Sequence, residues 1–185
     1  MTTTAIATPA QCLVLGWQSI HALRQALERD AGPQAAAWLQ EAGFAGGESL
    51  FTAYCEWLGD RYQVSRPGDL DVRHLGETLS AFFRDSGWGS LSISPLAPAI
   101  LALDSTDWWE ADPGMGAEYP TCHLSSGLLA EFLTRVSGSP LGAMEVECRS
   151  RGDARCRFLV GAPETLQVIY TSMAEGVAYQ DALNG

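Results

Sequence analysis

The stretch that decides the fold is GAMEVECRSRGDARCRFLV, residues 142–160. Its two halves, Gly142–Cys148 and Ala154–Val160, have the pattern of two antiparallel strands. The pair Gly152-Asp153 between them can supply the positive φ values that a tight hairpin turn needs. The stretch therefore predicts a β-hairpin near the C-terminal end of the chain.

Helices are predicted on both sides of this hairpin, because apolar residues recur there at steps of three and four. These helices span Leu15–Arg29, Gln34–Ala42, Glu48–Tyr62, Asp71–Asp85, His123–Val136 and Glu164–Ala182. Gly43 is expected to end the second helix, and Phe44–Gly47 to form a turn before the third. Two further strands are predicted at Ser90–Ser94 and Leu101–Leu103. The order of elements predicts an α+β fold, with helices packed on a small antiparallel sheet.

The composition describes an acidic globular chain. Of its 185 residues, 46% are hydrophobic and 18% are charged, which allows a core and argues against intrinsic disorder. The net charge of -11 disfavours binding to nucleic acid and to anionic lipid, because both are polyanions. No apolar run reaches the roughly 20 residues of a membrane-spanning helix, and no leader is recognised. We therefore expect a cytoplasmic protein with one domain over residues 13–185 and a flexible arm over residues 1–12.

The five cysteines are an odd number, which argues against a secreted disulfide framework. Each cysteine is then either a small buried hydrophobe or a metal ligand. Cys148 and Cys156 would lie opposite each other in the hairpin, with Cβ atoms about 4.5–5.5 Å apart, which suits two ligands of one zinc ion. Cys122 comes just before a predicted helix, where the helix dipole favours a thiolate.

Glu145 is the fourth candidate ligand, because it stands close to Cys148 in the sequence. On a regular strand this spacing would put the two side chains on opposite faces, so a metal site requires a bend or bulge near Val146-Glu147. His123, next to Cys122, is an alternative ligand. In the other interpretation, the thiols are buried and unrelated, and Glu145 is solvated. The spacing alone leaves both interpretations open.

The stretch Tyr119–Pro163 resembles the 4-vinyl reductase domain, also called the hydrocarbon-binding domain. The resemblance is carried by Cys122, Gly127, the run GAMEVEC at 142–148, Gly152 and the run CRF at 156–158. Weaker similarities extend it over nearly the whole chain. The family includes sensor domains of aromatic-responsive activators and proteins linked to bacteriochlorophyll synthesis. Its fold is similar to that of subunits of the TRAPP vesicle-tethering complex, so the resemblance implies the ligand-binding fold of NO signalling and Golgi transport.

The resemblance also implies a structural zinc ion. The phenol sensors of the family hold zinc with a Cys, a Glu and two further Cys at similar spacing. The matching residues of this chain are Cys122, Glu145, Cys148 and Cys156. Four protein ligands leave no open coordination position for water or substrate, so the Zn²⁺ would be structural.

An apolar pocket is expected between two of the predicted helices, Glu48–Tyr62 and Asp71–Asp85, and the sheet. The residues expected to bind its ligand are Tyr54, His74, Phe82, Phe83, Trp88, Trp108 and Phe132. His74 either hydrogen-bonds a ligand hydroxyl or is an exposed helix residue. Trp108 and its neighbour Trp109 form a lid over the pocket, pack against a partner chain, or belong to a plain surface loop.

Two departures from the phenol sensors bear on the ligand. Where those sensors carry polar aromatic residues, this chain has Phe132 and Ala143. The resemblance therefore implies a ligand that is larger or less polar than phenol.

We expect a stand-alone sensor or carrier of an aromatic, hydrocarbon or tetrapyrrole-like molecule. The alternatives are an accessory protein or reductase-like factor of bacteriochlorophyll and tetrapyrrole biosynthesis, and a dimeric assembly scaffold. The chain has no nicotinamide, flavin or hydrolase motif, so binding is favoured over catalysis. A two-fold homodimer is expected, since apolar residues cluster near the N-terminus. They are Leu13, Val14, Leu15, Trp17 and Ile20.

Overall fold

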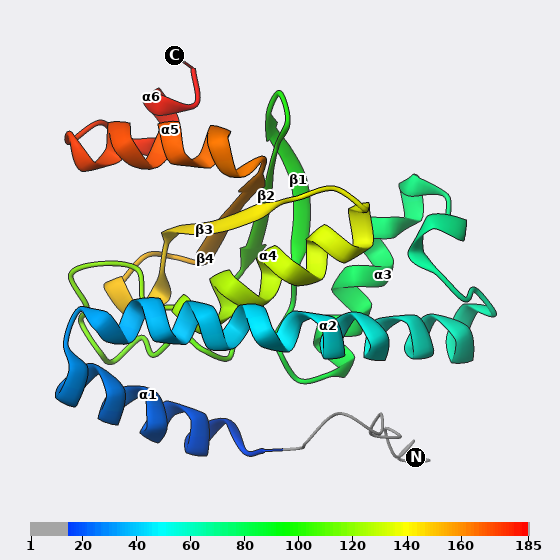
Figure 1. Cartoon of the computed structure of the whole chain (residues 1–185), viewed down its shortest axis with the longest axis horizontal. Coiled ribbons are helices and arrows are strands. Elements are labelled where there is room, and N and C mark those ends of the chain that lie inside the picture. The colour runs from blue at the N-terminus through cyan, green and yellow to red at the C-terminus, as the bar shows by residue number, and fades with distance from the viewer. Residues whose placement is uncertain (1–14, 185) are drawn as a thin grey trace.

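The computed structural model describes residues 15–184, in which helices cover both faces of one sheet (Figure 1). The helices are α1 Trp17–Ala31, α2 Gln34–Tyr62, α3 Val72–Asp85, α4 His123–Ser137, α5 Pro163–Ala174 and α6 Tyr179–Ala182. The strands are β1 Ser92–Ala97, β2 Ile100–Ser105, β3 Gly142–Glu147 and β4 Cys156–Gly161. Short 3-10 turns lie at Pro67–Asp69 and Arg149–Arg151. The predicted α+β class is confirmed.

The strands form one antiparallel sheet in the order β1-β2-β4-β3, so β1 and β3 are its edges. Pro95 lies in the edge strand β1, where a missing backbone N–H is tolerated. β3 and β4 form the predicted hairpin. Because β3 is an edge strand, one side of its backbone is free of strand partners.

A bulge interrupts the pairing of β3 with β4. Glu145 lies opposite Phe158 and Glu147 lies opposite Arg157, so Val146 is an extra residue in β3. The structure therefore has the bend near Val146-Glu147 that the metal interpretation required. Beyond the bulge, side chains no longer alternate between the two faces of the sheet in step with those before it. Glu145 and Cys148 can therefore point to the same side.

The core has two parts, one on each face of the sheet. Phe158 and Val160 of β4 pack with residues of α2, α3 and α4. Leu159, between them, packs with Leu166 and Ile169 of α5. Successive side chains of a strand point to opposite faces, so β4 is buried on both. This arrangement places α5 and α6 across the sheet from the α2–α4 layer (Figure 1).

The expectation of two helices separated at Phe44–Gly47 was wrong, since α2 runs unbroken from Gln34 to Tyr62. Its glycines do not form a turn; they allow the backbone of α2 to lie close to that of α4. A Cβ atom on Gly43 would lie 2.0 Å from the carbonyl oxygen of Leu124, and one on Gly127 would lie 1.9 Å from that of Gln40. The two backbones touch, which only glycine permits at both positions.

The C-terminal helix is also shorter than expected. The sequence predicted one helix over Glu164–Ala182, but α5 ends at Ala174 and α6 begins at Tyr179. Gly176 between them has a φ of 91°, a left-handed conformation that ends a helix. The break lets Tyr179 turn back and pack on the sheet.

Several sequence expectations fall on residues 1–14, which lie outside the described part of the chain. These are the arm over residues 1–12, Cys12, and the apolar residues Leu13 and Val14. In residues 15–184, no helix has both the length and the apolar character needed to cross a membrane.

Candidate functional site

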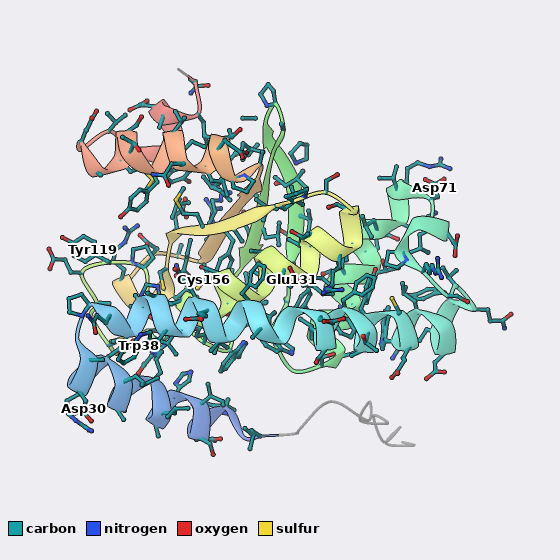
Figure 2. All side chains as sticks on the ribbon, viewed as in Figure 1. Asp30, Trp38, Asp71, Tyr119, Glu131 and Cys156 are labelled. Carbon is teal, nitrogen blue, oxygen red and sulfur yellow. The ribbon has the colours of Figure 1, made fainter. Side chains whose placement is uncertain are left out.

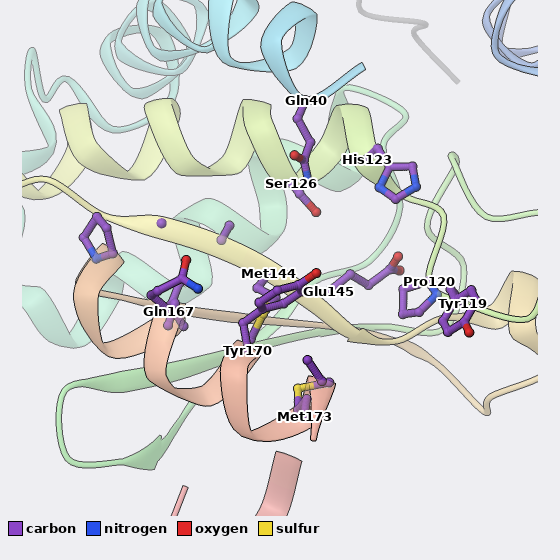
Figure 3. A pocket seen from close by; sticks show the side chains of 15 residues that line it. Gln40, Tyr119, Pro120, His123, Ser126, Met144, Glu145, Gln167, Tyr170 and Met173 are labelled. Atoms are coloured by element: carbon purple, nitrogen blue, oxygen red, sulfur yellow. The ribbon is translucent and has the colours of Figure 1, made fainter. Parts of the chain in front are cut away.

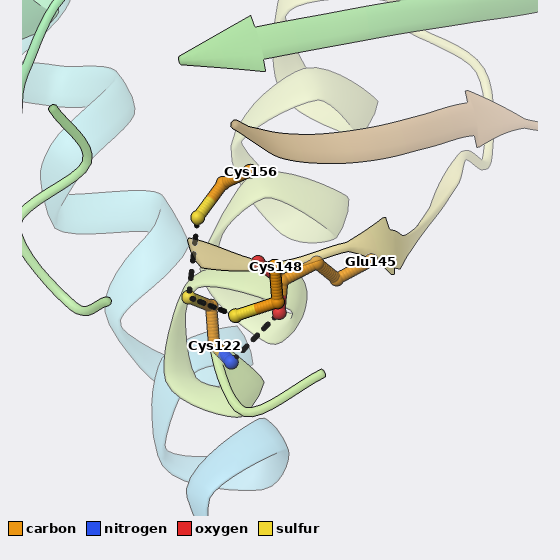
Figure 4. A group of neighbouring side chains, drawn as sticks. All are labelled: Cys122, Glu145, Cys148 and Cys156. Carbon is orange, nitrogen blue, oxygen red and sulfur yellow. Dashed lines mark hydrogen bonds between the residues drawn. The ribbon is translucent and has the colours of Figure 1, made fainter. Parts of the chain in front are cut away.

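A group of four buried side chains gathers where the hairpin meets the start of α4 (Figure 4). We call Cys122, Glu145, Cys148 and Cys156 the cysteine group. Cys122 is the residue before α4, and Glu145 lies on β3. Cys148 and Cys156 lie just beyond the last β3–β4 pair. One potential ligand atom from each of the four lies within 4.8 Å of all the others.

The distances within the cysteine group fit a tetrahedral metal ion. The Sγ atom of Cys122 is 3.8 Å from that of Cys148 and 3.9 Å from that of Cys156. Two thiolates bound at about 2.3 Å to one tetrahedral zinc lie about 3.8 Å apart. The sulfurs are therefore too far apart for a disulfide and well separated for a shared cation.

The hydrogen bonding of Glu145 gives a second indication that the cysteine group could hold a cation. Its Oε2 accepts a hydrogen bond of 2.9 Å from the backbone N–H of Cys122. Its Oε1 is buried, and no described residue gives it a hydrogen bond. An orphaned buried carboxylate oxygen costs free energy, which a bound cation would offset.

The protonation of the cysteine group reflects its burial. Hydrogen bonds from Cys122 and Cys156 lower the pKa of Cys148, whereas burial raises the pKa of Cys122 well above its usual value. Burial also raises the pKa of Glu145 to about 8. Without a cation the group therefore resists becoming fully ionised. A metal ion would stabilise all the charged forms together, and the four side chains can hold one.

The turn between β3 and β4 fixes the position of Cys148. The backbone N–H of Cys148 donates to Asp153 Oδ2 at 2.7 Å, and its carbonyl accepts from the N–H groups of Arg151 and Asp153. Gly152 has a φ of 96°, as the sequence predicted for this turn. These bonds hold the Cys148 backbone without using its thiol, which faces the Cys122 thiol.

His123, the alternative ligand, is not part of the cysteine group. Its side chain is half-buried and lines a cleft beside α5. The sequence could not decide between His123 and Cys122 as the ligand. The direction in which each side chain points depends on where α4 begins and how it is oriented, and only the structure gives both.

Most of the residues predicted to line a pocket pack together in one aromatic cluster. Its members are Tyr54, Phe82, Phe83, Trp88, Trp108 and Phe132. The centroids of the rings in contact lie between 5.1 Å, for Tyr54 and Phe82, and 6.3 Å, for Phe82 and Phe132. Rings at this separation are in direct contact. The structure thus brings these residues together as mutually packed side chains.

The buried polar atoms of Tyr54 and Trp108 have partners. Tyr54 Oη and Thr78 Oγ1 share a hydrogen bond of 2.7 Å, and burial raises the pKa of Tyr54 to about 12. Trp108 Nε1 donates to Ser125 Oγ at 2.8 Å. Trp108 is only 1% exposed, so it belongs to the core.

Two other residues named in the pocket prediction, His74 and Trp109, lie at the surface of the protein or of the cluster. His74 is exposed on α3, with its Nδ1 3.5 Å from Glu77 Oε2. Trp109 is half-buried and meets Trp88 edge to face at the surface of the cluster.

Sequence reasoning missed a second buried carboxylate beside α4. Glu110 is 1% exposed and accepts hydrogen bonds from the N–H groups of Leu124 and Ser125 and from the Ser125 hydroxyl. Burial raises the pKa of Glu110 to about 7, although these bonds lower it. Arg24 of α1 donates to the Glu110 carbonyl at 2.5 Å. Glu110 caps the start of α4 from a distant loop, so no local capping pattern could reveal it.

Sequence reasoning also missed a cleft of about 660 Å³ between α5 and the α4–β3 layer (Figure 3). Its walls come from α2, α4, β3, α5 and the loop before α4. The residues that line it are Gln40, Tyr119, Pro120, His123, Ser126, Gly142, Ala143, Met144, Glu145, Pro163, Leu166, Gln167, Tyr170, Met173 and Ala174. Glu145 therefore belongs both to the cysteine group and to this cleft.

Residues 110–162 match the family model of the 4-vinyl reductase domain, and this segment contains the whole cysteine group. The resemblance that the sequence predicted is thereby confirmed over the segment. Protein MJ0745 of Methanocaldococcus jannaschii, described as uncharacterized, is 28% identical over 82 residues. That match covers 44% of this chain and 44% of the relative, so the chain spans less than half of the relative's length.

Two solved structures have a similar fold. One is the phenol-responsive sensory domain of the transcription activator PoxR, solved with phenol, with a TM-score of 0.61 and 17% identity over 83% of this chain and 77% of that chain. The other is a vinyl-4-reductase family protein from Methanocaldococcus jannaschii, with a TM-score of 0.50 and 18% identity over 82% of this chain and 83% of that chain. At these identities the likeness establishes the fold.

Proposed function

We propose that this chain is a sensor or carrier domain for a hydrophobic small molecule, held together by a structural zinc ion. The match to the 4-vinyl reductase domain over residues 110–162 carries the proposal. The likeness of fold to a phenol-responsive sensory domain supports it. In this proposal residues 13–185 form one domain of the 4-vinyl reductase type, and the fold is that of ligand-binding domains in NO signalling and Golgi transport.

The proposed zinc ligands are the cysteine group, Cys122, Glu145, Cys148 and Cys156. Three sulfurs and one carboxylate oxygen are a donor set that zinc prefers. The sulfur separations and the orphaned Oε1 of Glu145 both support a cation at this place. With four protein ligands the ion would tie α4 to the hairpin, and it would leave no position for a substrate.

Metal analysis tests the zinc part of the proposal. Protein purified without a histidine tag should contain about one zinc per chain, and a strong chelator should lower its melting temperature. The metal contributes to folding because the unfolded chain does not hold the four ligands together. Protein that contains no zinc and whose melting temperature ignores both chelator and added zinc would contradict this part.

The aromatic cluster, together with His74 on α3, is the ligand site that the sequence proposes. A ligand there has to separate rings that are already in contact. Native mass spectrometry after incubation with phenol, naphthalene or a porphyrin tests binding directly. A bound phenol or naphthalene supports the sensor or carrier function. A bound porphyrin supports the alternative, an accessory or reductase-like role in bacteriochlorophyll and tetrapyrrole synthesis, and no binding supports a scaffold.

A cytoplasmic homodimer completes the proposal. Trp17 and Leu23 of α1 are 56% and 57% exposed, and Trp38 of α2, labelled in Figure 2, is 49% exposed. Such large exposed apolar side chains are typical of surfaces that bind another chain. Light scattering should give about twice the chain mass of 19.8 kDa, and a monomer mass at micromolar concentration would remove the dimer.

A further inference from the structure

The cleft between α5 and the α4–β3 layer has the size of a binding site. Its volume of about 660 Å³ falls within the roughly 300–1,000 Å³ typical of pockets for small organic ligands. Residues far apart in the sequence build it, so it exists only in the folded chain. It lies outside the aromatic cluster, whose side chains do not line it.

The walls of the cleft differ in polarity. The α5 wall carries Leu166, Tyr170 and Met173, and Figure 3 shows Tyr170 and Met173 across the cleft from the α4 residues. His123 and Ser126 of α4 form the opposite wall and can exchange hydrogen bonds with an occupant. An apolar body against α5 and one hydrogen-bonding group towards α4 would match both walls.

The floor of the cleft is β3. Four consecutive residues, Gly142 to Glu145, line it. Successive side chains of a strand point to opposite faces, so a consecutive run places the edge of the strand along the cleft. β3 is an edge of the sheet, and its free backbone groups add hydrogen-bond donors and acceptors to the floor.

The charges at the cleft select against anions. Among the described residues that line it, none is Lys or Arg, and Glu145 is acidic. The whole chain has a net charge of -11. A carboxylate or phosphate would lose its hydration at this place without gaining a cationic partner. A cationic occupant gains no carboxylate partner either, because Glu145 Oε2 already accepts from the Cys122 N–H and Oε1 is buried. The occupant is therefore uncharged.

We infer that this cleft binds a neutral, mainly apolar organic molecule of two or more rings that carries one hydrogen-bonding group. The inference rests on the proposed sensor or carrier function and names the site and ligand class for it. Because Glu145 lines the cleft and belongs to the cysteine group, an occupant would contact the same strand that holds the proposed metal ligands.

The test uses N-phenyl-1-naphthylamine, a neutral probe with a fused and a single ring and one N–H donor, whose fluorescence rises in apolar surroundings. Ala174→Trp places a large ring in the cleft at an exposed position of α5. Val168→Trp is the matched control, because Val168 lies on the same helix, is 65% exposed and does not line the cleft. Circular dichroism and melting curves first establish that both variants fold as the parent does.

We expect the parent to bind the probe with saturation near one per chain. Ala174→Trp should weaken binding at least tenfold, and Val168→Trp should change it less than twofold. Equal binding by the parent and Ala174→Trp, or equal loss in both variants, would overturn the cleft site while small-molecule binding itself stands. A parent that binds neither this probe nor phenol would overturn the cleft site and the sensor or carrier function together.

Discussion

The aromatic cluster and the cysteine group adjoin the same helix, α4, but are completed in different ways. The rings of the cluster contact one another, and its buried polar atoms, such as Tyr54 Oη and Trp108 Nε1, have protein partners. In the cysteine group the thiols face one another, and Glu145 Oε1 lacks a partner among the described residues. Apolar side chains can satisfy one another by contact alone, whereas a group of buried anionic ligands needs a cation.

Two carboxylates beside α4 show the same difference at the level of single residues. Glu110 is buried and its oxygens accept hydrogen bonds from the start of α4. Glu145 is almost as buried, at 8% exposure, but only Oε2 has a partner. The comparison indicates that the chain by itself satisfies Glu110, whereas the group that contains Glu145 could hold a metal ion. Each of the following predictions tests this distinction.

The largest effect should follow from Cys148→Ser. If the cysteine group holds zinc, the variant should lose the metal and about 5 kcal/mol or more of unfolding free energy, which would unfold most of the protein. Cys55→Ser is the control, because Cys55 is half-buried on α2 and outside the group, and it should cost about 1 kcal/mol or less. Urea unfolding and metal content measure both. Equal stability of the two variants would make the cysteine group an ordinary part of the core.

Phe132→Ala should cost about 3–5 kcal/mol of unfolding free energy, because it leaves a cavity among rings that contact it on three sides. Zinc content of the folded fraction should stay at the parental value, since the aromatic cluster does not use the metal. Urea unfolding together with metal analysis separates the two quantities. Loss of zinc from folded Phe132→Ala protein would show that the two regions are not independent.

The crossing of α2 and α4 joins the two regions, and Gly43→Ala should weaken it by about 3 kcal/mol. Its Cβ would lie 2.0 Å from the backbone oxygen of Leu124, so the helices would have to separate. Gly46→Ala, on the same helix, is the control, because its Cβ would meet only Leu128 Cδ1 at 3.7 Å. It should stabilise α2 by up to about 1 kcal/mol, since alanine favours a helix over glycine. Equal effects in thermal unfolding would mean that the helices do not touch there.

The smallest effect concerns the pH dependence that Glu110 contributes. Its pKa is about 7 in the folded state and near 4.5 when exposed, so between these values the folded state binds more protons. Its contribution to stability therefore falls as the pH rises from about 4.5 to about 7, and then levels off.

Glu110→Gln removes this titration. Relative to the variant, the parent should lose about 2 kcal/mol of unfolding free energy between pH 5 and pH 8. This is less than the full shift, because at pH 5 the exposed carboxyl is already mostly ionised. Urea unfolding of both proteins at the two pH values measures the difference. A difference that does not change with pH would show that Glu110 titrates normally.

Features encoded over short distances could be predicted from the sequence. The hairpin and the positive φ of Gly152 were predicted because residues 142–160 contain both strands and the turn between them. The bulge in β3 entered only as a condition of the metal interpretation. Helices α1, α3 and α4 were predicted nearly to their ends by apolar spacing, and Asp71 caps α3 as a short polar residue does. The four residues of the cysteine group were named because of their spacing in a recognised pattern, and the structure places them together.

Features that depend on contacts between distant segments could not be predicted. Gly43–Gly47 has the composition of a turn, and only the approach of Gly127 from α4 explains why it is helical. Glu110 caps α4 from a loop, and the cleft needs α5 to lie across the sheet edge from α2 and α4.

The sequence by itself thus determined the α+β class and the hairpin, which follow from local conformation, and the set of candidate metal ligands, which follows from the resemblance to a known family. Only the tertiary structure decided that α2 is continuous, that the predicted pocket residues pack against one another, and that an open cleft lies beside Glu145. The physical reason is that the close crossing of α2 and α4, the packing of the rings and the cleft each arise where segments distant in the sequence come into contact. The backbone preferences of a glycine or an aromatic residue are the same whatever segment packs against it, so they do not reveal that segment.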